Sequence, residues 1–342
     1  MQALMLERCQ PIVEGRDPLV LRDIDVPQPG REEVLIRVLA CGVCHTELDE
    51  IEGRTPPAFL PMILGHQVIG EIVELGDGVM GLDAGARIGV AWIYSACGRC
   101  EFCNRGLENL CPHFLATGRD AHGGYAEYMV APAGFVHPIP ESLATVQAAP
   151  LLCAGAIGYR SLALTGLENG QVLGLTGFGG SGHLVLHMAR HLFPDSPVYV
   201  FARSPEQRRF ALELGAAWAG ASDEEPPRLL DSIIDTTPVW KPVMDALAVL
   251  KPGGRLVINA IRKQEDDKNL LLKLRYENHL WMEKEIKSVA NVCRSDVREF
   301  LALAAQTGIQ PEVLTYPLQD ASMALFELKK GNFRGARVLV ME

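Results

Sequence analysis

The chain lacks any hydrophobic run long enough to cross a membrane. Although 48% of its 342 residues are hydrophobic, no stretch approaches the roughly 18 uncharged apolar residues that a membrane span needs. The opening stretch, MQALMLERCQPIVEG, has neither the basic start nor the sustained apolar run of a secretory signal. These absences predict a globular protein that is neither exported nor embedded in a membrane, and we expect it in the cytoplasm.

Positive charge is also in short supply. Lys and Arg number 32 against 42 Asp and Glu, which gives a net charge of -10 and an isoelectric point near 5.5. Contact with nucleic acid or an anionic membrane requires a basic surface, which this composition does not favour. The expected partners are therefore small molecules, and the length alone predicts two domains.

Cysteine, by contrast, is concentrated in one short stretch. The segment CGRCEFCNRGLENLC holds four of the nine cysteines, with gaps of two, two and seven residues: Cys97, Cys100, Cys103 and Cys111. Disulfides are rare in a reducing compartment, and the intervening Gly and Asn let a backbone wrap a small ion. The pattern predicts a closed, tetrahedral structural zinc site. A four-cysteine iron–sulfur cluster is the competing interpretation, which the lack of a second cysteine motif disfavours.

Three further residues of metal-binding type lie outside this stretch. CGVCHTELD and LGHQVIGEIVELGDGV contain Cys44 and His66, and APLLCAGAIGYRSL contains Cys153 in an apolar run. Taken singly, each is more often a packing residue, because isolated Cys and His side chains are often buried in cores.

A glycine-rich segment follows. In QVLGLTGFGGSGHLVLHMARHL, an apolar run at 172–176 precedes a helical pattern at 183–192, with Gly177, Gly179, Gly180 and Gly182 between them. Strand, tight turn and helix in this order favour a dinucleotide site, where N–H groups at the helix start face the pyrophosphate. The alternative is an ordinary strand-to-helix turn.

The region after the glycines alternates between strand and helix patterns. We predict strands at 196–202, 231–235, 253–260 and 285–291, and helices at 205–216 and 241–250. Such alternation is typical of a doubly wound parallel α/β sheet.

Together these signals resemble the zinc-containing medium-chain alcohol dehydrogenases over nearly the whole chain. GVCHTEL, GHQVIGEIV, LLCAG, the cysteine-rich stretch and GFGGSG occur in the family's order and at similar distances. The resemblance implies two zinc ions per chain. One is catalytic, held by Cys44, His66 and Cys153 with a fourth position open, and the other is held by the four clustered cysteines.

The resemblance also implies a fold. A Rossmann dinucleotide-binding domain, 154–291, is expected to be inserted into a mainly β, GroES-like catalytic domain formed by 1–153 and 292–342, with the structural zinc lobe at 95–113. NVCRSDVREFLALAA would be the helix that re-enters the catalytic domain, and RGARVLVME a final strand. Either Arg334 or Arg337 could reach the cofactor pyrophosphate, and the protein would be a homodimer or homotetramer.

The implied activity is hydride transfer between a nicotinamide cofactor and a small primary or secondary alcohol, or the aldehyde or ketone in reverse. Zinc acts as a Lewis acid on the substrate oxygen, and the Thr46 hydroxyl starts the proton's path to solvent. Many members place His where this chain has Asp49, which is either the terminal base or a solvated loop acid. His45 either contacts the pyrophosphate or assists the relay.

Three further positions bear on the active site. Gln67 stands where the family usually has Glu, which removes a negative charge near the metal. Glu47 is expected to orient His66 through its second ring nitrogen; otherwise it is a surface acid. Trp92 matches an aromatic of the family's substrate pocket, and a core Trp is the competing view.

The expected cofactor is NADP(H), with NAD(H) as the alternative. NAD sites place Asp or Glu roughly 20 residues past the glycines, but the count from Gly182 reaches Ala202, followed by Arg203 and Ser204. Arg203 and Ser204, with Arg208, could hold a 2′-phosphate, although Arg203 could instead stack on adenine in an NAD enzyme.

Two rival functions share this scaffold. One is a zinc-free quinone or enoyl reductase, against which Cys44 and Cys153 argue. The other is a non-enzymatic metal- or redox-sensing protein, in which the changes at Gln67 and Asp49 would mark lost turnover.

Overall fold

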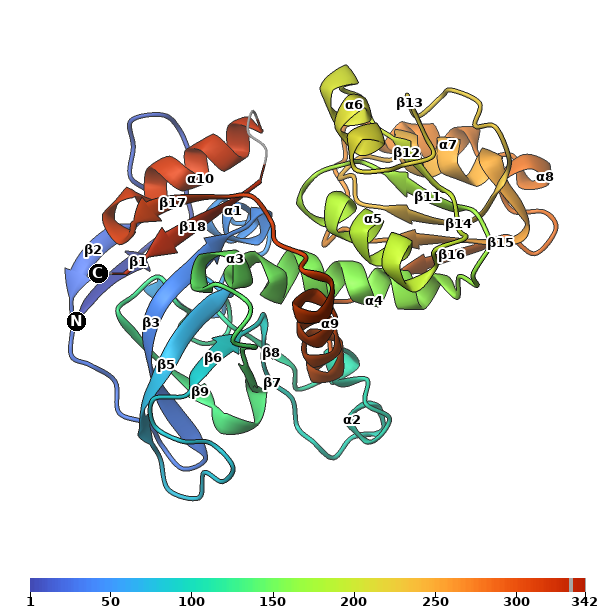
Figure 1. Cartoon of the computed structure of the whole chain (residues 1–342). Helices are drawn as coiled ribbons and strands as arrows, with labels where there is room; N and C mark the ends of the chain where they lie inside the picture. Colours follow the sequence, from blue (N-terminus) through green and yellow to red (C-terminus); the bar gives the residue numbers. More distant parts are fainter. Residues whose placement is uncertain (332–334, 342) are drawn as a thin grey trace. The chain divides into compact units, whose positions relative to one another are not determined.

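The computed structural model describes residues 1–331 and 335–341. They divide into two compact units, one made of Met1–Ala156 with Asn291–Glu342 and the other of Ile157–Ala290, which we call unit 1 and unit 2 (Figure 1). No helix in the described ranges combines the length and the apolar character that crossing a bilayer demands.

Unit 1 is built mainly from antiparallel sheets. Its largest sheet has the strand order β10-β6-β5-β3-β18-β17, with β9 also paired to β3, and a three-stranded sheet has the order β2-β1-β4. The strands are β1 (Gln2–Leu6), β2 (Val20–Asp23), β3 (Glu33–Val43), β4 (Met62–Ile63), β5 (Val68–Leu75), β6 (Arg87–Val90), β7 (Ile93–Ser95), β8 (Leu115–Ala116), β9 (Tyr128–Pro132), β10 (Val136–Pro138), β17 (Val313–Pro317) and β18 (Ala336–Val340).

The long strand β3 organises this unit. Its sequence, EVLIRVLACGV, is rich in β-branched and aliphatic residues and is buried along most of its length. It pairs with β5, β9 and β18, so segments from both ends of the chain join one core. The final strand β18 was predicted from RGARVLVME, and the structure confirms it.

The helices of unit 1 connect and cover these strands (Figure 1). They are α1 (His45–Ile51), α2 (Glu101–Asn104), η1 (Glu108–Leu110), η2 (Ala133–Phe135), α3 (Thr145–Pro150), the π-helical turn η3 (Leu151–Gly155), α9 (Arg294–Thr307), η5 (Leu318–Asp320) and α10 (Ala321–Lys330). The predicted re-entry helix is α9. It begins where Asp296 accepts a hydrogen bond from the Cys293 backbone and ends at the left-handed Gly308.

Unit 2 contains the predicted parallel sheet. Its strand order is β13-β12-β11-β14-β15-β16, and every neighbouring pair is parallel. The elements are α4 (Ala156–Thr165), β11 (Leu173–Thr176), α5 (Gly180–Leu192), β12 (Val198–Phe201), α6 (Pro205–Glu213), β13 (Trp218–Gly220), β14 (Leu230–Asp235), α7 (Lys241–Val249), β15 (Leu250–Ile258), η4 (Lys268–Lys273), α8 (Tyr276–His279) and β16 (Glu285–Ser288).

The central strands of this sheet are buried on both faces. β11 and β12 are mostly apolar, and no residue of β11, β12 or β14 is exposed, as expected where helices cover a parallel sheet. The order is that of a doubly wound Rossmann sheet. The expected fold class, a Rossmann domain inserted into a mainly β domain, is therefore confirmed.

Candidate active site and metal centres

Three residues from distant segments converge at the carboxyl end of β3. Cys44 directly follows β3 and caps α1, His66 precedes β5, and Cys153 lies within the π-helical turn η3. One sulfur or nitrogen atom of each lies within 4.8 Å of the others, and the Cys44 and Cys153 Sγ atoms are 3.9 Å apart. A π-helical turn of this kind often marks a functional site.

Glu47 holds two of these residues in place. It is fully buried, and its Oε1 lies 2.6 Å from Nδ1 of His66. Its Oε2 accepts a hydrogen bond of 2.7 Å from the Cys44 backbone N–H. The interpretation of Glu47 as a surface acid is therefore wrong, because α1 turns this side chain into the protein.

The charges at this cluster perturb one another strongly. Burial alone would lower the pKa of His66, but the facing Glu47 carboxylate and Cys44 raise it well above its usual value. A hydrogen bond from Cys153 lowers the pKa of Cys44, and the same bond, with burial, raises the pKa of Cys153. Without a metal, one sulfur of the pair is thus the preferred thiolate; a bound cation would favour the ionised form of both.

The cluster fits a zinc ion with an open coordination position. His66 is 1% exposed, and its Nε2 has no hydrogen-bond partner within the described part of the chain. A buried, unsatisfied nitrogen beside two thiols is costly unless something binds there. Two sulfurs and one imidazole are a donor set that zinc accepts, with the fourth position left for another ligand.

The four clustered cysteines form a second set on a local loop. Their sulfurs all lie within 4.8 Å of one another, with Cys103 at 3.9 Å from Cys97 and 3.5 Å from Cys100. Cys111 Sγ accepts hydrogen bonds from the backbone N–H groups of Cys97 and His113. Four thiols complete a tetrahedral set of ligands, which fits a closed, structural zinc site.

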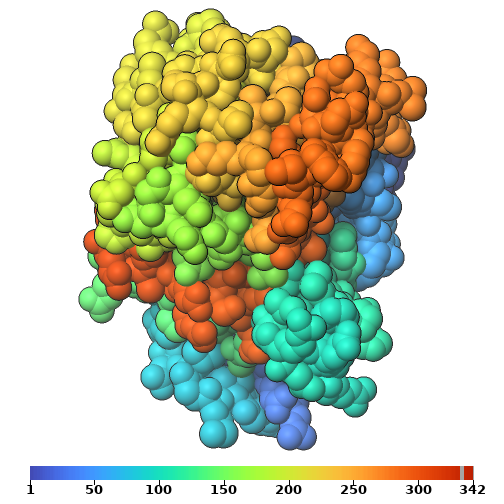
Figure 2. Space-filling model, turned by 90° about the vertical axis from the view of Figure 1, so that its right-hand side faces the viewer, coloured from blue at the N-terminus to red at the C-terminus, as the bar shows by residue number. Residues whose placement is uncertain are grey.

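The thiols of this loop differ in acidity. Hydrogen bonds led by the Arg99 backbone lower the pKa of Cys97 to about 6. Desolvation and its hydrogen bond to Cys100 raise the pKa of Cys103 to about 12. Figure 2 shows this loop, in turquoise, as a rounded protrusion on the surface of unit 1.

Other residues expected near the active site lie in or beside α1. The Thr46 Oγ1 is 3.6 Å from the Cys44 sulfur, and His45 is exposed at the first helical position. Asp49 is 5% exposed and accepts a hydrogen bond of 2.5 Å from the Arg54 guanidinium. The solvated-loop interpretation of Asp49 is therefore wrong: it is a buried helical residue with a cationic partner.

Sequence reasoning missed another buried acid on the same helix. Glu50 is fully buried, and neither carboxylate oxygen has a hydrogen-bond partner among the residues described. Burial, followed by the negative charge of Glu47, raises its pKa well above the usual value. The helical spacing of Glu47 and Glu50, three residues apart, was the available signal that both face one side.

Gln67 and Trp92 border this region of unit 1. Gln67 is 3% exposed, and its backbone carbonyl accepts a hydrogen bond from Gly42. Trp92 is half-buried; its ring centre lies 5.5 Å from that of Phe114, and the Arg119 guanidinium lies 5.1 Å above it.

The glycine turn in unit 2 leaves room for an anion. Gly177 has a φ of +81°, and a Cβ there would lie 2.7 Å from Thr236 Oγ1. A Cβ on Gly182 would lie 2.9 Å from the Gly177 carbonyl, so the first turn of α5 packs closely on the strand end. Around Gly179 and Gly180 the space is open. The first N–H groups of a helix have no partner within that helix, so an open glycine turn before α5 suits a pyrophosphate.

The end of β12 carries the residues expected to choose the cofactor. Arg203 is exposed, and Ser204 caps α6 by accepting a hydrogen bond from the Gln207 backbone. The Ser204 hydroxyl also donates to Glu206, at 2.5 Å, and Arg208 pairs with Glu224 at 3.5 Å. Glu206 was not predicted, because a count of about 20 residues from Gly182 ends at Ala202, four residues before it.

Of the two arginines predicted to reach the pyrophosphate, the structure describes one. Arg337 is 3% exposed on β18, opposite Val43 of β3, and its Nε lies 3.7 Å from a Glu327 oxygen. Arg334 lies outside the described residues.

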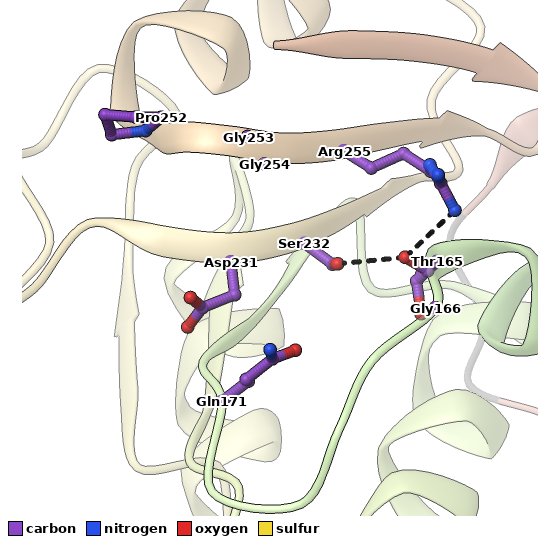
Figure 3. Close-up of a pocket in the computed structure, with 9 residues that line it drawn as sticks. All are labelled: Thr165, Gly166, Gln171, Asp231, Ser232, Pro252, Gly253, Gly254 and Arg255. Atoms are coloured by element: carbon purple, nitrogen blue, oxygen red, sulfur yellow. Dashed lines mark hydrogen bonds between the residues drawn. The ribbon is translucent and has the colours of Figure 1, made fainter. Parts of the chain in front are cut away.

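A pocket of about 340 Å³ in unit 2 holds none of these residues. Figure 3 shows it at the amino-terminal ends of β14 and β15, lined among others by Asp231, Ser232 and Arg255. The glycine turn lies at the opposite, carboxyl end of the sheet. Asp231 is paired with Lys251 and Arg255 with Glu285, so the charges of this pocket are internally balanced.

A GroES-like β domain, a dinucleotide fold and cysteine–histidine sets that fit zinc define a class: the metal-dependent, nicotinamide-dependent oxidoreductases. Comparisons with known proteins identify a family within this class. Residues 30–141 match the alcohol dehydrogenase GroES-like domain. The probable alcohol dehydrogenase AdhA of Mycobacterium tuberculosis is 42% identical over 100% of this chain and 97% of its own length.

An alcohol dehydrogenase of Geobacillus stearothermophilus is 33% identical over 96% of this chain and 97% of its own. Among solved structures, a cinnamyl alcohol dehydrogenase of Sorghum bicolor superposes with a TM-score of 0.84 at 29% identity. That match covers 99% of this chain and 97% of the other. The chain therefore belongs to the zinc-containing medium-chain alcohol dehydrogenase family, and it is an oxidoreductase that acts on the CH–OH group of small molecules.

Proposed function

We propose that this chain is an alcohol dehydrogenase and aldehyde reductase with two zinc ions, the catalytic one held by Cys44, His66 and Cys153. The observation that carries the proposal is the convergence of these three ligand atoms within 4.8 Å. They come from segments as much as 109 residues apart. Chance packing would not also leave the facing His66 nitrogen unsatisfied. Both cysteines are needed for this cluster, which disfavours the zinc-free reductase alternative.

Two residues beside the ligands, Glu47 and Thr46, have roles in the proposed reaction. Zinc, when bound, supplies Lewis-acid polarisation of the substrate oxygen. Glu47 fixes the His66 ring through Nδ1 and the Cys44 backbone through its N–H, which holds both ligands in orientation. The Thr46 hydroxyl lies 3.6 Å from the Cys44 sulfur, which supports a role in relaying the substrate's hydroxyl proton, taking it up while passing its own onward.

Beyond Thr46, the proton path proposed for this chain does not end at a free Asp49. That carboxylate is buried and bonded to Arg54, so it serves better to position α1 than to take up a proton. The exposed His45 is the better candidate for passing the proton to solvent. With Gln67 in place of an acid, no carboxylate at that position offsets the charge of the metal.

For the cofactor, we propose a preference for NADP(H), with NAD(H) also accepted. The exposed Arg203 at the end of β12 is the side chain best placed to bind a 2′-phosphate. Glu206 opposes this, since it engages the Ser204 hydroxyl and adds negative charge. Replacement of Arg203 by Ala should therefore reduce the NADPH to NADH ratio of kcat/KM, and Glu206→Gln should raise it.

The test of the central proposal is metal content together with turnover. Wild type should contain two zinc ions per chain and oxidise NADPH in the presence of small aldehydes. Cys44→Ala should contain one zinc and no longer turn over, whereas Cys9→Ala, which removes an exposed thiol outside both sets, should behave as wild type. One zinc in every variant and no turnover would leave only the closed site and would contradict the catalytic assignment.

We further propose that the protein is cytoplasmic and forms a homodimer or homotetramer. β16 lies at the edge of its sheet with all four residues exposed. Large apolar side chains on the preceding segment are also exposed: Leu272, Leu274, Tyr276, Trp281 and Met282. An open strand edge beside apolar surface favours pairing with another copy. Light scattering of wild type against Ile286→Lys would test this, since only an edge-strand interface predicts dissociation.

A further inference from the structure

The cysteine loop is fastened to the start of helix α9. Glu108, between Cys103 and Cys111, accepts a hydrogen bond of 3.1 Å from the Arg294 backbone N–H and one of 2.7 Å from the Arg294 Nε. Its carboxylate also forms an ion pair with Nη2 of the same guanidinium. The neighbouring Asn109 accepts a hydrogen bond of 3.0 Å from the Cys293 thiol. Figures 1 and 2 both show α9 beside the loop.

This fastening is stronger than an ordinary surface ion pair. Glu108 is 8% exposed, and although burial raises its pKa, the hydrogen bonds from Arg294 lower it. Arg294 also donates to the Gly134 carbonyl at 2.8 Å and lies 4.6 Å from the centre of the Phe135 ring. Several partners restrict the guanidinium at once, which ties the loop to the start of the helix.

Farther along, the same helix supports the turn that carries Cys153. Phe300 is fully buried, and a Cβ built on Gly155 would overlap its ring, so the phenyl group lies directly against the backbone there. Gly155 ends the π-helical turn η3, two residues after Cys153. Phe300 lies six residues beyond Arg294, which is about 9 Å along a helix axis.

We propose that α9 is a strut between the two metal centres, and that Arg294 is a positioning residue that sets the Cys153 sulfur through Phe300 and Gly155. The inference rests on the two-zinc function proposed above. Buried residues along α9, among them Val297 and Leu301, keep the helix fixed between its ends. Displacement of the Glu108 end therefore shifts the ring beneath Gly155, which changes the geometry of the catalytic ligand set.

The experiment measures metal release from the intact protein to a chelator. Wild type should release its two zinc ions in separate phases, and Cys44→Ala and Cys103→Ala should each remove one phase and so assign both. Glu108→Gln keeps the side-chain size and removes the charge. It should release the metal of the Cys44 set roughly threefold to tenfold faster, and cobalt placed in that set should show altered absorption bands.

Two further variants make the result specific. Phe300→Leu should also speed metal release from the Cys44 set. The double variant of Phe300→Leu with Glu108→Gln should lower the release barrier by less than the sum of the two single effects, because both substitutions act on one path. Glu71→Gln is the matched control. It breaks an ion pair with Arg37 at 2.5 Å in the same unit, away from α9, and should change neither phase.

The failures are distinguishable. A wild type with a single release phase would overturn the two-zinc function on which the strut depends. If wild type shows two release phases but Glu108→Gln changes neither the release rate from the Cys44 set nor the cobalt absorption bands, the strut alone is overturned. Equal acceleration by Glu71→Gln would do the same, since it would show a general loss of stability.

Discussion

The two sets of candidate metal ligands are assembled in opposite ways. The four cysteines of the loop lie within fifteen residues, so a short backbone segment brings them together. Cys44, His66 and Cys153 come from three separate elements and meet only when β3, β5 and η3 are packed. The first set depends on local chain geometry and the second on the whole of unit 1.

This difference matches the two kinds of chemistry. Four thiols complete a tetrahedron and leave nothing for a substrate, whereas three ligands leave one position open. Each set has one buried member, Cys111 in the closed set and His66 in the open set, and its other members are partly exposed. The open set is also supported by the fully buried Glu47 carboxylate. A local closed site suits stability, and an open site built from distant elements suits catalysis. Variants of each set should therefore separate activity from stability.

The largest effect is expected from Cys153→Ser. Serine is a poor zinc ligand, so the open set should lose its metal and the Lewis-acid contribution of several kcal/mol. Turnover should fall on the order of a thousandfold or more, with little change in the thermal unfolding midpoint. Steady-state kinetics and calorimetry check this, with Cys41→Ala as a control for a buried thiol outside both sets. Retained turnover would mean that the open set is not catalytic.

Cys103→Ser should give the opposite pattern. Loss of a structural metal is among the strongly destabilising changes, and we expect about 4 kcal/mol, or roughly 10 °C in the unfolding midpoint. At a temperature well below that midpoint, the variant should keep one zinc and a measurable share of its turnover. If turnover disappeared while the midpoint stayed unchanged, the division of roles between the two sets would be reversed.

A smaller effect tests how the open set is held. Glu47→Gln keeps one acceptor oxygen but cannot serve both the His66 ring and the Cys44 backbone as a carboxylate does. Loss of such a supporting group typically weakens metal affinity about tenfold to a hundredfold. Competition with a chelator should show this for the open set alone, and Glu71→Gln should leave both affinities unchanged.

The contrast between the sets also explains what could be predicted from sequence. The spacing of the four cysteines and the strand–glycine–helix order are local patterns, and the structure shows the expected loop and turn. No spacing rule connects residues 109 positions apart, so Cys44, His66 and Cys153 were brought together only by the family resemblance. Their convergence depends on packing that no local pattern encodes.

The wrong interpretations have a common physical origin. Glu47 and Asp49 were each allowed to be solvated, because acids are rarely buried without partners. Helix α1 instead turns these acids and Glu50 inward, where His66 and Arg54 face the first two. Glu206 was missed for a different reason: it belongs to the first turn of α6, past the strand end where the sequence argument looked for an acid.

The smallest predicted effect concerns the pH dependence of stability due to His137, a residue close to the cysteine loop. Burial, with the positive charges of Arg294 and Arg298, lowers the pKa of His137 to about 4, and Glu108 only partly opposes this. The unfolded chain takes up the proton near pH 6.5 but the folded chain only near 4. Stability therefore falls as pH drops through this window. At pH 5.5 the loss due to His137 should be about 1.4 kcal/mol.

Urea unfolding of wild type and His137→Asn at pH 7.5 and 5.5 isolates this contribution. The two proteins share the acid-sensitive thiols of both metal sets, so the difference between their pH effects belongs to the histidine. The variant should lose about 1.4 kcal/mol less than wild type on acidification. His137 lies beside Glu108 and Arg294, which fasten the loop to α9, so this loss of stability concerns the support of the closed set. Equal losses in both proteins would show that the proton goes elsewhere.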